Sequence, residues 1–433
     1  MTTKPERGLR ELYDDDPERA DALVFGRRRF LAQSALAGMG AVLGLAIPFG
    51  RYMPAGLIPV ALAESEDAFV IPGKDGLTVL NDRPINAETP THLLDDEITP
   101  NSRHFVRNNG IVPERAETRD VSDWRLTVDG EVETPLTLTL GDLKSRFKTV
   151  SYALQLECGG NGRAAFNPPA RGNQWTVGAI GNARWTGVRL RDVLKAAGIR
   201  DSAVYTGHYS EDLHLSGNPD KDAISRGGPT DKMMERHTLL AFEMNGEALP
   251  AQHGFPVRIV APGWPGSVSQ KWLRRIWVRD QVHDGAKMTG TSYRVPAYPV
   301  SPGQRVPKDD FRIIEAMPVK SLITFPKSGL ELAAGTRSVE VRGHAWAGEN
   351  RVAQLDVSRD FGATWQQAKL SAPPNRYSWQ RWRAAVDLPG PGYYEIWARA
   401  TDDEGASQPF AIDWNPKGYL NNSLHRIAVT VAA

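Results

Sequence analysis

Cysteine is nearly absent from this 433-residue sequence, which contains only Cys158. A disulfide bond within the chain is therefore impossible. Cysteine-rich zinc sites and iron–sulfur clusters are also excluded, because each needs several thiolates. No Cys-x-x-Cys-His motif is present for covalent haem attachment. A Walker motif and a Gly-x-Gly-x-x-Gly that opens a helix are missing too, so an ordinary nucleotide cofactor has little support.

Excess charge of either sign is absent as well. The 52 basic and 51 acidic side chains give a formal net charge of +1. This balance does not support a broad nucleic-acid-binding surface or a polybasic membrane-binding surface. Hydrophobic residues at 41% and charged residues at 24% are ordinary for a globular protein. We therefore expect a folded protein of two or three domains with no nucleic-acid partner.

The first 63 residues have the features of an export signal. Three arginines at 27–29 precede Phe30-Leu31, an apolar run extends over 32–48, and Ala-Leu-Ala at 61–63 offers a cleavage site. Paired arginines ahead of Phe-Leu favour the twin-arginine route, which carries folded, cofactor-loaded proteins to the periplasm. An uncleaved anchor is the alternative, but a run of about 17 residues is marginal for crossing about 30 Å of hydrocarbon.

Composition divides the rest of the chain. Residues 64–118 are rich in Pro, Asn and Asp, and we expect an irregular segment that packs on the domain that follows. Residues 119–300 mix strand patterns with a few short helices, which predicts an α+β domain. Within it, Asp129-Gly130 is the predicted turn of a hairpin.

The pattern changes after a Pro-containing linker at 298–310. Residues 310–433 contain short strand patterns separated by turn signals, at a spacing of about ten residues. The clearest are SVEVRGHAW, VAQLDVSRD, YYEIWARATD and RIAVTVAA. This arrangement predicts an antiparallel β-sandwich of the immunoglobulin-like kind.

The one cysteine lies in LQLECGGNGR (154–163), where an alternating strand pattern gives way to Gly159-Gly160. A thiolate is a soft metal ligand and a strong nucleophile, and the glycines leave room for a bulky group. Arg163 could lower the pKa of the thiol or bind a nearby anion. A buried structural cysteine is the alternative. An oxidising destination argues against a bare thiol unless it is buried or ligated.

A second segment, HGFPVRIVAPGWPGSVSQKW (253–272), carries basic groups along a path bent by glycines and prolines. Its His253, Arg258 and Lys271 suit a phosphate-bearing ligand.

These segments, with FVRNN (105–109), WTVGAIGNARWTGVRLRDVL (175–194) and KWLRRI (271–276), occur in the order seen in one family. From about Pro100 to Ala433 the chain resembles the sulfite oxidase family of molybdenum enzymes, in particular bacterial periplasmic sulfite dehydrogenases without a haem domain. GHAWAG, LDVSRDFGATW and IDWNPKGYLNNSLHRIAV extend the match into the second domain. The resemblance implies a molybdopterin-binding α+β domain at 119–300 and a β-sandwich dimerisation domain at 310–433.

The resemblance also assigns roles to residues. Cys158 matches the thiolate ligand of molybdenum, and Arg107 and Arg163 match arginines that face the sulfite anion. Trp175 matches a wall of the same pocket, and Tyr293 the active-site tyrosine. The residues that match groups holding the pterin and its phosphate are Asn108, Asn109, His253, Arg258, Ser269 and Lys271.

The sequence departs from the family at several positions. Eukaryotic members often carry His where Asn109 stands and Arg where Gly162 stands. In the family, the dimerisation domain contributes a third arginine to the substrate pocket. Gln380 occupies the corresponding position in this sequence, with Arg381 beside it. Tyr298 is a second match for the active-site tyrosine.

The implied activity is oxidation of sulfite to sulfate by oxygen-atom transfer in a homodimer. We expect no haem on this chain, so electrons would pass to a separate c-type cytochrome. Alternatives are the sulfane dehydrogenase subunit of a thiosulfate-oxidising system and an exported non-enzymatic β-sandwich binding protein. Methionine sulfoxide reductases generally lack the second domain, and a cysteine hydrolase would need a paired histidine that no local signature supplies.

Overall fold

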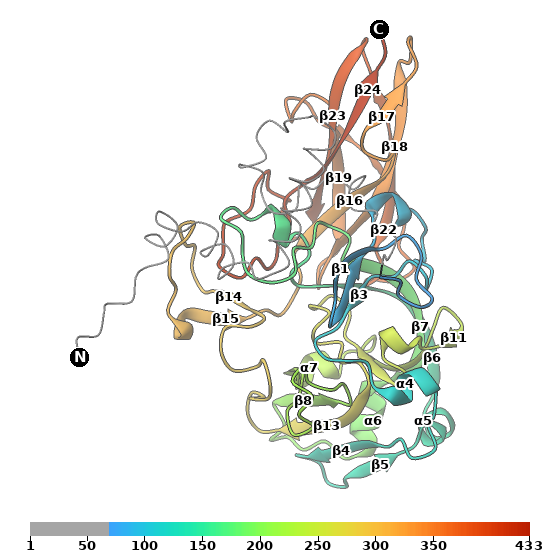
Figure 1. Ribbon diagram of the computed structural model, residues 1–433, viewed down its shortest axis with the longest axis vertical. Coiled ribbons are helices and arrows are strands. Elements are labelled where there is room, and N and C mark those ends of the chain that lie inside the picture. The colour runs from blue at the N-terminus through green and yellow to red at the C-terminus, as the bar shows by residue number, and fades with distance from the viewer. Residues whose placement is uncertain (1–68) are drawn as a thin grey trace, which may run out of the picture. The chain divides into compact units, whose positions relative to one another are not determined.

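The computed structural model describes residues 69–433 (Figure 1). The predicted export signal at 1–63 lies outside these residues, so it stays a prediction. Within the described chain, no helix is both long and apolar enough to cross a membrane.

The segment expected to be irregular forms a small antiparallel sheet instead, with strand order β1-β2-β3. Its elements are β1 (Thr78–Asp82), β2 (Ile85–Glu88), η3 (Thr91–Leu93), β3 (Val106–Arg107) and α4 (Glu114–Thr118). The sequence did not predict these strands because β2 buries polar residues, Asn86 and Glu88, so it shows no apolar alternation. Asn86 Oδ1 accepts from the Asn108 N–H at 3.0 Å, which fixes the chain directly after Arg107.

The first domain contains two five-stranded sheets, one with the path β11-β10-β7-β6 and β12 paired to β10, the other with the order β5-β4-β13-β8-β9. The strands are β4 (Leu126–Gly130), β5 (Leu136–Leu138), β6 (Thr149–Glu157), β7 (Ile180–Arg189), β8 (Tyr205–Ser210), β9 (Gly227–Pro229), β10 (Leu239–Met244), β11 (Glu247–Ala248), β12 (Arg258–Val260) and β13 (Leu273–Arg279). The short helices are α5 (Leu140–Arg146), α6 (Leu190–Ala196), α7 (Thr230–Met233), η4 (Arg163–Ala165) and η5 (Ala251–His253).

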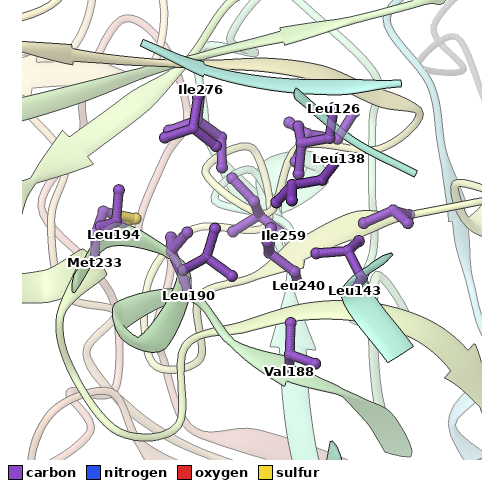
Figure 2. Close-up of a cluster of buried hydrophobic side chains, with 14 of the residues drawn as sticks. Leu126, Leu138, Leu143, Val188, Leu190, Leu194, Met233, Leu240, Ile259 and Ile276 are labelled. Carbon is purple, nitrogen blue, oxygen red and sulfur yellow. The ribbon is translucent and has the colours of Figure 1, made fainter. Parts of the chain in front are cut away.

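Apolar side chains from both sheets and from the helices form the core of this domain. Figure 2 shows Leu126 and Ile276 of one sheet pointing toward Leu240 and Ile259 of the other, with Leu190 of α6 beside them. Each of these five side chains is fully buried. Burial of this apolar surface is the main favourable term that holds the two sheets together.

The hairpin turn predicted at Asp129-Gly130 was wrong. Strand β4 continues through Gly130 and the chain returns only at Leu136. The reason is that β4 also pairs in parallel with β13, where Val278 lies opposite Gly130. A Cβ at Gly130, whose φ is +94°, would lie 2.1 Å from the Val278 carbonyl oxygen, so this glycine permits the close approach of β13.

A short hairpin of β14 (Arg294–Pro296) and β15 (Phe311–Ile313), with η6 (Lys308–Asp310) between them, leads into the second domain. That domain packs the sheet β16-β18-β22-β21 against the sheet β17-β24-β23-β19-β20. The strands are β16 (Val319–Phe325), β17 (Leu330–Leu332), β18 (Ser338–Ala347), β19 (Val352–Ser358), β20 (Gln366–Gln367), β21 (Lys369–Leu370), β22 (Gln380–Asp387), β23 (Gly392–Asp402) and β24 (His425–Val431). Pairing is antiparallel except between β17 and β24. The predicted α+β domain followed by a β-sandwich is confirmed.

Candidate active site

A pocket is lined by residues from β3, the Cys158 turn and the 253–272 segment. Its empty volume is about 720 Å³, which includes the solvent at its open mouth. Eight of the eleven residues predicted from the sequence line it: Arg107, Asn109, Cys158, His253, Arg258, Ser269, Lys271 and Tyr293. The fold therefore gathers residues as far apart in sequence as Arg107 and Tyr293 around one thiol.

Cys158 follows the last residue of β6 and begins a turn. Its N–H donates to the Ala179 carbonyl at 2.9 Å and its own carbonyl accepts from the Asn161 N–H at 2.9 Å. The side chain is 8% exposed and packs with Phe105 and Trp175, yet it also lines the pocket. The thiol is thus packed on one side and reaches the cavity on the other.

A buried ion pair fixes the residue before this cysteine. The Glu157 carboxylate accepts from Lys320 Nζ at 2.9 Å, from Trp346 Nε1 at 2.8 Å and from Asn161 Nδ2 at 3.0 Å. Glu157 is 1% exposed and Lys320 3% exposed. Lys320 and Trp346 belong to β16 and β18, so the sandwich domain holds the end of β6 next to Cys158.

Four residues form what we call the arginine–tyrosine cluster: Arg107, Asn109 and Tyr293, which line the pocket, and Lys287, which contacts Asn109. The Asn109 side-chain oxygen accepts from Arg107 Nη2 at 3.0 Å, from Lys287 Nζ at 2.8 Å and from the Tyr293 hydroxyl at 3.1 Å. Arg107 Nη2 also lies 3.3 Å from the Tyr293 hydroxyl. Asn109 therefore holds three donors in fixed positions, and Lys287 is a member that the sequence did not reveal.

Electrostatics keep Arg107 charged. Burial acts to lower the pKa of Arg107, but Tyr293 and Cys158, whose ionised forms attract a guanidinium, raise it above its ordinary value. Tyr298, the second match for the active-site tyrosine, is 43% exposed and donates to Asp310 at 2.5 Å. Of the two tyrosines, Tyr293 is the one that lines the pocket.

Arg163 and Trp175 do not line the pocket. Arg163 donates from Nε to the Lys417 carbonyl and from Nη1 to the Asn173 carbonyl, each at 3.0 Å. Two backbone carbonyls thus hold a guanidinium that was expected to face the substrate anion, and only Arg107 of the two arginines lines the pocket. Trp175 is fully buried against Cys158, and its indole nitrogen has no partner within the described residues.

A second group is the lysine–histidine cluster, made of Lys74, His253, Arg258 and Lys271. Its last three members line the pocket, and Lys74 contacts His253. Arg258 donates to the carbonyls of His253 at 3.0 Å and Ser269 at 2.9 Å. Lys271 Nζ donates to the Gln252 carbonyl at 2.8 Å and also to the side-chain oxygen of Asn108. Asn108 lies beneath the surface of the pocket, where it fixes Lys271.

Lys74 is a residue that the sequence analysis missed, because it lies in a loop with no motif. Its Nζ lies 2.5 Å from His253 Nε2 and donates to the His104 carbonyl at 2.8 Å. Burial lowers the pKa of Lys74 to about 7 and that of His104 to about 3. Burial also lowers the pKa of His253 well below its ordinary value, so both histidines are neutral at physiological pH.

Arg226 was missed for the same reason. It is fully buried, and its guanidinium lies 4.9 Å from the centre of the Tyr293 ring. Nη1 donates to the Met288 sulfur at 3.0 Å, whereas Nε and Nη2 have no partner within the described residues. Burial lowers the pKa of Arg226. A buried arginine with free donors behind Tyr293 adds to the positive potential around the arginine–tyrosine cluster.

Charge is unbalanced around the pocket. Among its described lining residues Asp212 is the only carboxylate, against three cationic side chains, Arg107, Arg258 and Lys271. Further polar atoms in the wall have no partner within residues 69–433; they belong to His104, Asp212, Ser267 and Gln270. Buried charges and polar groups are costly unless they are paired. The wall therefore fits an anionic ligand with many hydrogen-bonding groups, as a pterin phosphate is.

Cys158 fits a soft metal brought in by that ligand. Within the described chain, no group of three or more His, Cys, Asp or Glu side chains is arranged to hold a metal ion. A metal bound to Cys158 must therefore take its other ligands from an organic group or from water. A molybdenum–molybdopterin cofactor, with dithiolene sulfurs and a phosphate, meets both requirements.

Comparison with known proteins decides the family. Residues 110–287 match the model of the oxidoreductase molybdopterin binding domain, and residues 311–432 match the Mo-co oxidoreductase dimerisation domain. Chicken sulfite oxidase is 35% identical over 384 residues, which cover 84% of this chain and 81% of the chicken protein. The chain belongs to the sulfite oxidase family. The predicted family, fold and molybdopterin cofactor are confirmed.

Two further similar proteins differ from this chain in length or carry the name of another activity. Human mitochondrial sulfite oxidase is 36% identical over 82% of this chain, but this chain spans only 66% of the human protein. Among solved structures, the sulfane dehydrogenase SoxCD from Paracoccus pantotrophus superposes with a TM-score of 0.67 at 28% identity. The match covers 88% of this chain and 92% of that chain.

The resemblance placed a third arginine of the family at Gln380, with Arg381 beside it. Gln380 and Arg381 lie on β22, opposite Ala345 and His344, and neither lines the pocket. The sandwich domain approaches the site through residues 417–421 instead, where Asn421 Nδ2 donates to the Gly162 carbonyl at 2.7 Å.

Proposed function

We propose that this protein is a molybdenum-dependent sulfite dehydrogenase. The overall reaction takes sulfite and water to sulfate, two protons and two electrons. The observation that carries the proposal is the arginine–tyrosine cluster beside Cys158, in a pocket lined by three cationic side chains and one carboxylate. A small oxyanion is the ligand that a fixed guanidinium and a phenol hydroxyl suit best.

The cofactor, when bound, supplies the oxygen atom and accepts the two electrons. Cys158 would hold its metal, and Arg258, Lys271 and His253 would hold the pterin and its phosphate. Ser269 and Asn108 act through their contacts with Arg258 and Lys271. The protein itself therefore contributes binding, orientation and electrostatics.

Arg107 and Tyr293 act on the substrate anion. The Arg107 guanidinium neutralises sulfite and fixes its orientation, because Asn109 restrains Nη2 at 3.0 Å. The Tyr293 hydroxyl donates its one hydrogen to Asn109 at 3.1 Å, and it would turn this hydrogen to the substrate anion when that anion binds. The positive charge of the buried Arg226, next to the Tyr293 ring, favours binding of an anionic substrate over a cationic one.

We further propose that the protein acts in the periplasm as a homodimer and reduces a separate c-type cytochrome one electron at a time. Paired arginines ahead of Phe30-Leu31 support export, and the dimerisation domain at 311–432 supports the dimer. Replacing Arg27, Arg28 and Arg29 with lysine should leave the protein in the cytoplasmic fraction. Sedimentation of the mature protein should give twice the mass of one chain.

A Cys158→Ser variant tests the activity. Wild-type protein should contain about one molybdenum per chain and reduce cytochrome c when sulfite is added, and the variant should lose sulfite-dependent reduction. Tyr298→Phe is a control, because Tyr298 is exposed and lies outside the pocket. Full turnover by Cys158→Ser would contradict the proposal.

Sulfane dehydrogenase activity is the second candidate, and the SoxCD likeness favours it. The same wild-type preparation should be given free sulfite in one assay, and thiosulfate with its carrier system in another. Turnover with sulfite alone supports sulfite dehydrogenase. Turnover only when the carrier-bound sulfane is present assigns the second function.

A further inference from the structure

Residues 415–421, part of the connection between β23 and β24 of the sandwich, contact the turn that follows Cys158. The Lys417 carbonyl accepts from Arg163 Nε at 3.0 Å, and the Leu420 N–H donates to the Gly159 carbonyl at 3.0 Å. Asn421 Nδ2 adds a bond of 2.7 Å to the Gly162 carbonyl. Both ends of the turn are thereby fixed by the second domain.

Tyr419, in the middle of this loop, contacts two predicted substrate groups at once. Its ring stacks on the Tyr293 ring, with centroids 5.8 Å apart and planes at 23°. The Arg163 guanidinium lies 4.9 Å from the centre of the Tyr419 ring on a cation–π contact. A Cβ at Gly159 would lie 3.8 Å from Tyr419 Cδ1, so the ring also packs against the Cys158 turn.

The Tyr419 hydroxyl supports the backbone of Tyr293. It accepts a hydrogen bond from the Tyr293 N–H at 3.3 Å. Tyr293 has a φ of +53°, a left-handed conformation that residues with a side chain rarely adopt. Strained positions of this kind persist only where their surroundings hold them. Burial raises the pKa of Tyr419, so the phenol stays protonated near neutral pH.

We infer that Tyr419 is a positioning residue of the active site, which holds Tyr293 and Arg163 in place beside the Cys158 turn. This inference rests on the proposed function for its substrate, but not for its geometry. The sandwich domain then sets the orientation of catalytic groups that belong to the first domain.

Two variants separate the ring from the hydroxyl. Tyr419→Leu removes the stacking surface for both Tyr293 and Arg163, so KM for sulfite should rise on the order of tenfold at full molybdenum content. Tyr419→Phe keeps the ring and loses only the acceptor for the Tyr293 N–H. Its KM should stay within about twofold while kcat falls a few-fold. Tyr393→Leu, at an exposed tyrosine of β23, is the matched control.

A spectroscopic measurement makes the test independent of the substrate. The Mo(V) signal of the holoenzyme, generated with dithionite, should change its pH dependence in both Tyr419 variants and not in Tyr393→Leu. If the wild type does not oxidise sulfite but the signal still shifts in the Tyr419 variants, the positioning role stands and the proposed substrate falls.

The result that overturns the inference is wild-type kcat, KM and Mo(V) signal in both Tyr419→Leu and Tyr419→Phe. If Tyr419→Leu loads no molybdenum, Tyr419→Phe decides the matter by the same three measurements. Recovery by phenylalanine of the KM that leucine loses would assign the role to the ring.

Discussion

The arginine–tyrosine cluster and the lysine–histidine cluster face one pocket but satisfy their polar groups differently. In the first, the Asn109 side-chain oxygen accepts from Arg107, Lys287 and Tyr293, so the side chains fix one another. In the second, Arg258 and Lys271 donate mainly to backbone carbonyls, and no carboxylate pairs with them in the hydrogen bonds of the described chain.

This difference matches two kinds of ligand. A cluster whose members are already fixed can bind and release a small anion at every turnover, because little reorganisation is needed. A cluster of buried cations without a counter-charge is costly until an anion arrives. The second cluster therefore suits a cofactor phosphate that stays bound, and the first suits a substrate that comes and goes.

The largest expected effect comes from breaking the second cluster. Lys271→Met should lower the molybdenum content of purified protein by at least about tenfold, because a charged hydrogen bond to the phosphate is worth about 1.5–3 kcal/mol. Metal analysis of protein purified in parallel measures it, with the exposed Lys148→Met as control. Since burial lowers the pKa of Lys271 far below its ordinary value, the cofactor-free variant should be at least as stable as cofactor-free wild type. Normal molybdenum content would contradict the assignment.

Substitution of a buried lysine that is paired with a carboxylate should lower stability, unlike substitution of Lys271. Lys320 is held by the Glu157 carboxylate at 2.9 Å, so Lys320→Met leaves a buried charge uncompensated. We expect a loss of about 3–5 kcal/mol in the free energy of unfolding, with or without cofactor. Urea unfolding measures it, and the double variant Glu157→Gln/Lys320→Met should recover much of the loss. A single variant as stable as wild type would show that the pair is not needed.

A substitution in the arginine–tyrosine cluster should leave the binding of the cofactor unchanged. Arg107→Gln should lower kcat/KM for sulfite by about 10- to 100-fold, which corresponds to one charged hydrogen bond of about 1.5–3 kcal/mol. Molybdenum content should stay at the wild-type level, and Arg125→Gln, at an exposed arginine, should match the wild type in both measurements. Loss of molybdenum in Arg107→Gln would remove the distinction between the two clusters.

The smallest expected effect concerns Lys74 and pH. The folded-state pKa of Lys74, about 7, lies below the ordinary value of 10.5. Protonated Lys74 therefore destabilises cofactor-free protein fully below about pH 7, and this cost disappears as the pH rises to about 10.5. The stability of Lys74→Met relative to wild type should fall as the pH rises through this window. Urea unfolding of cofactor-free protein at several pH values would reveal a flat difference if the idea is wrong.

Much of the fold and many of the residues that line the pocket could be predicted from the sequence. Strand patterns such as 338–347 are recognisable because alternate residues face a core. Motif residues such as Cys158 and Lys271 line the pocket as expected, since local motifs keep their spacing. The small sheet at 78–107 was not predictable from alternation because two of its buried side chains, Asn86 and Glu88, are polar.

The rest of the site depends on contacts between distant segments. Lys74 reaches His253 across 179 positions, and Arg226 lies under Tyr293 with no motif to mark it. The orientation of Arg163 is set by the carbonyl of Lys417, 254 positions away. A single sequence shows which side chains exist, but such contacts arise only when distant segments of the chain pack together.

The Glu157–Lys320 pair has a consequence for how the enzyme is made. Lys320 and Trp346 are synthesised about 160 to 190 residues after Glu157 and, at roughly 5–20 residues per second, many seconds later. Until they arrive, the strand end next to the thiol carries an unmatched carboxylate. Maturation should therefore be strictly post-translational: chains truncated before the sandwich should emerge as empty, protease-sensitive proteins and not as monomeric enzymes with partial activity.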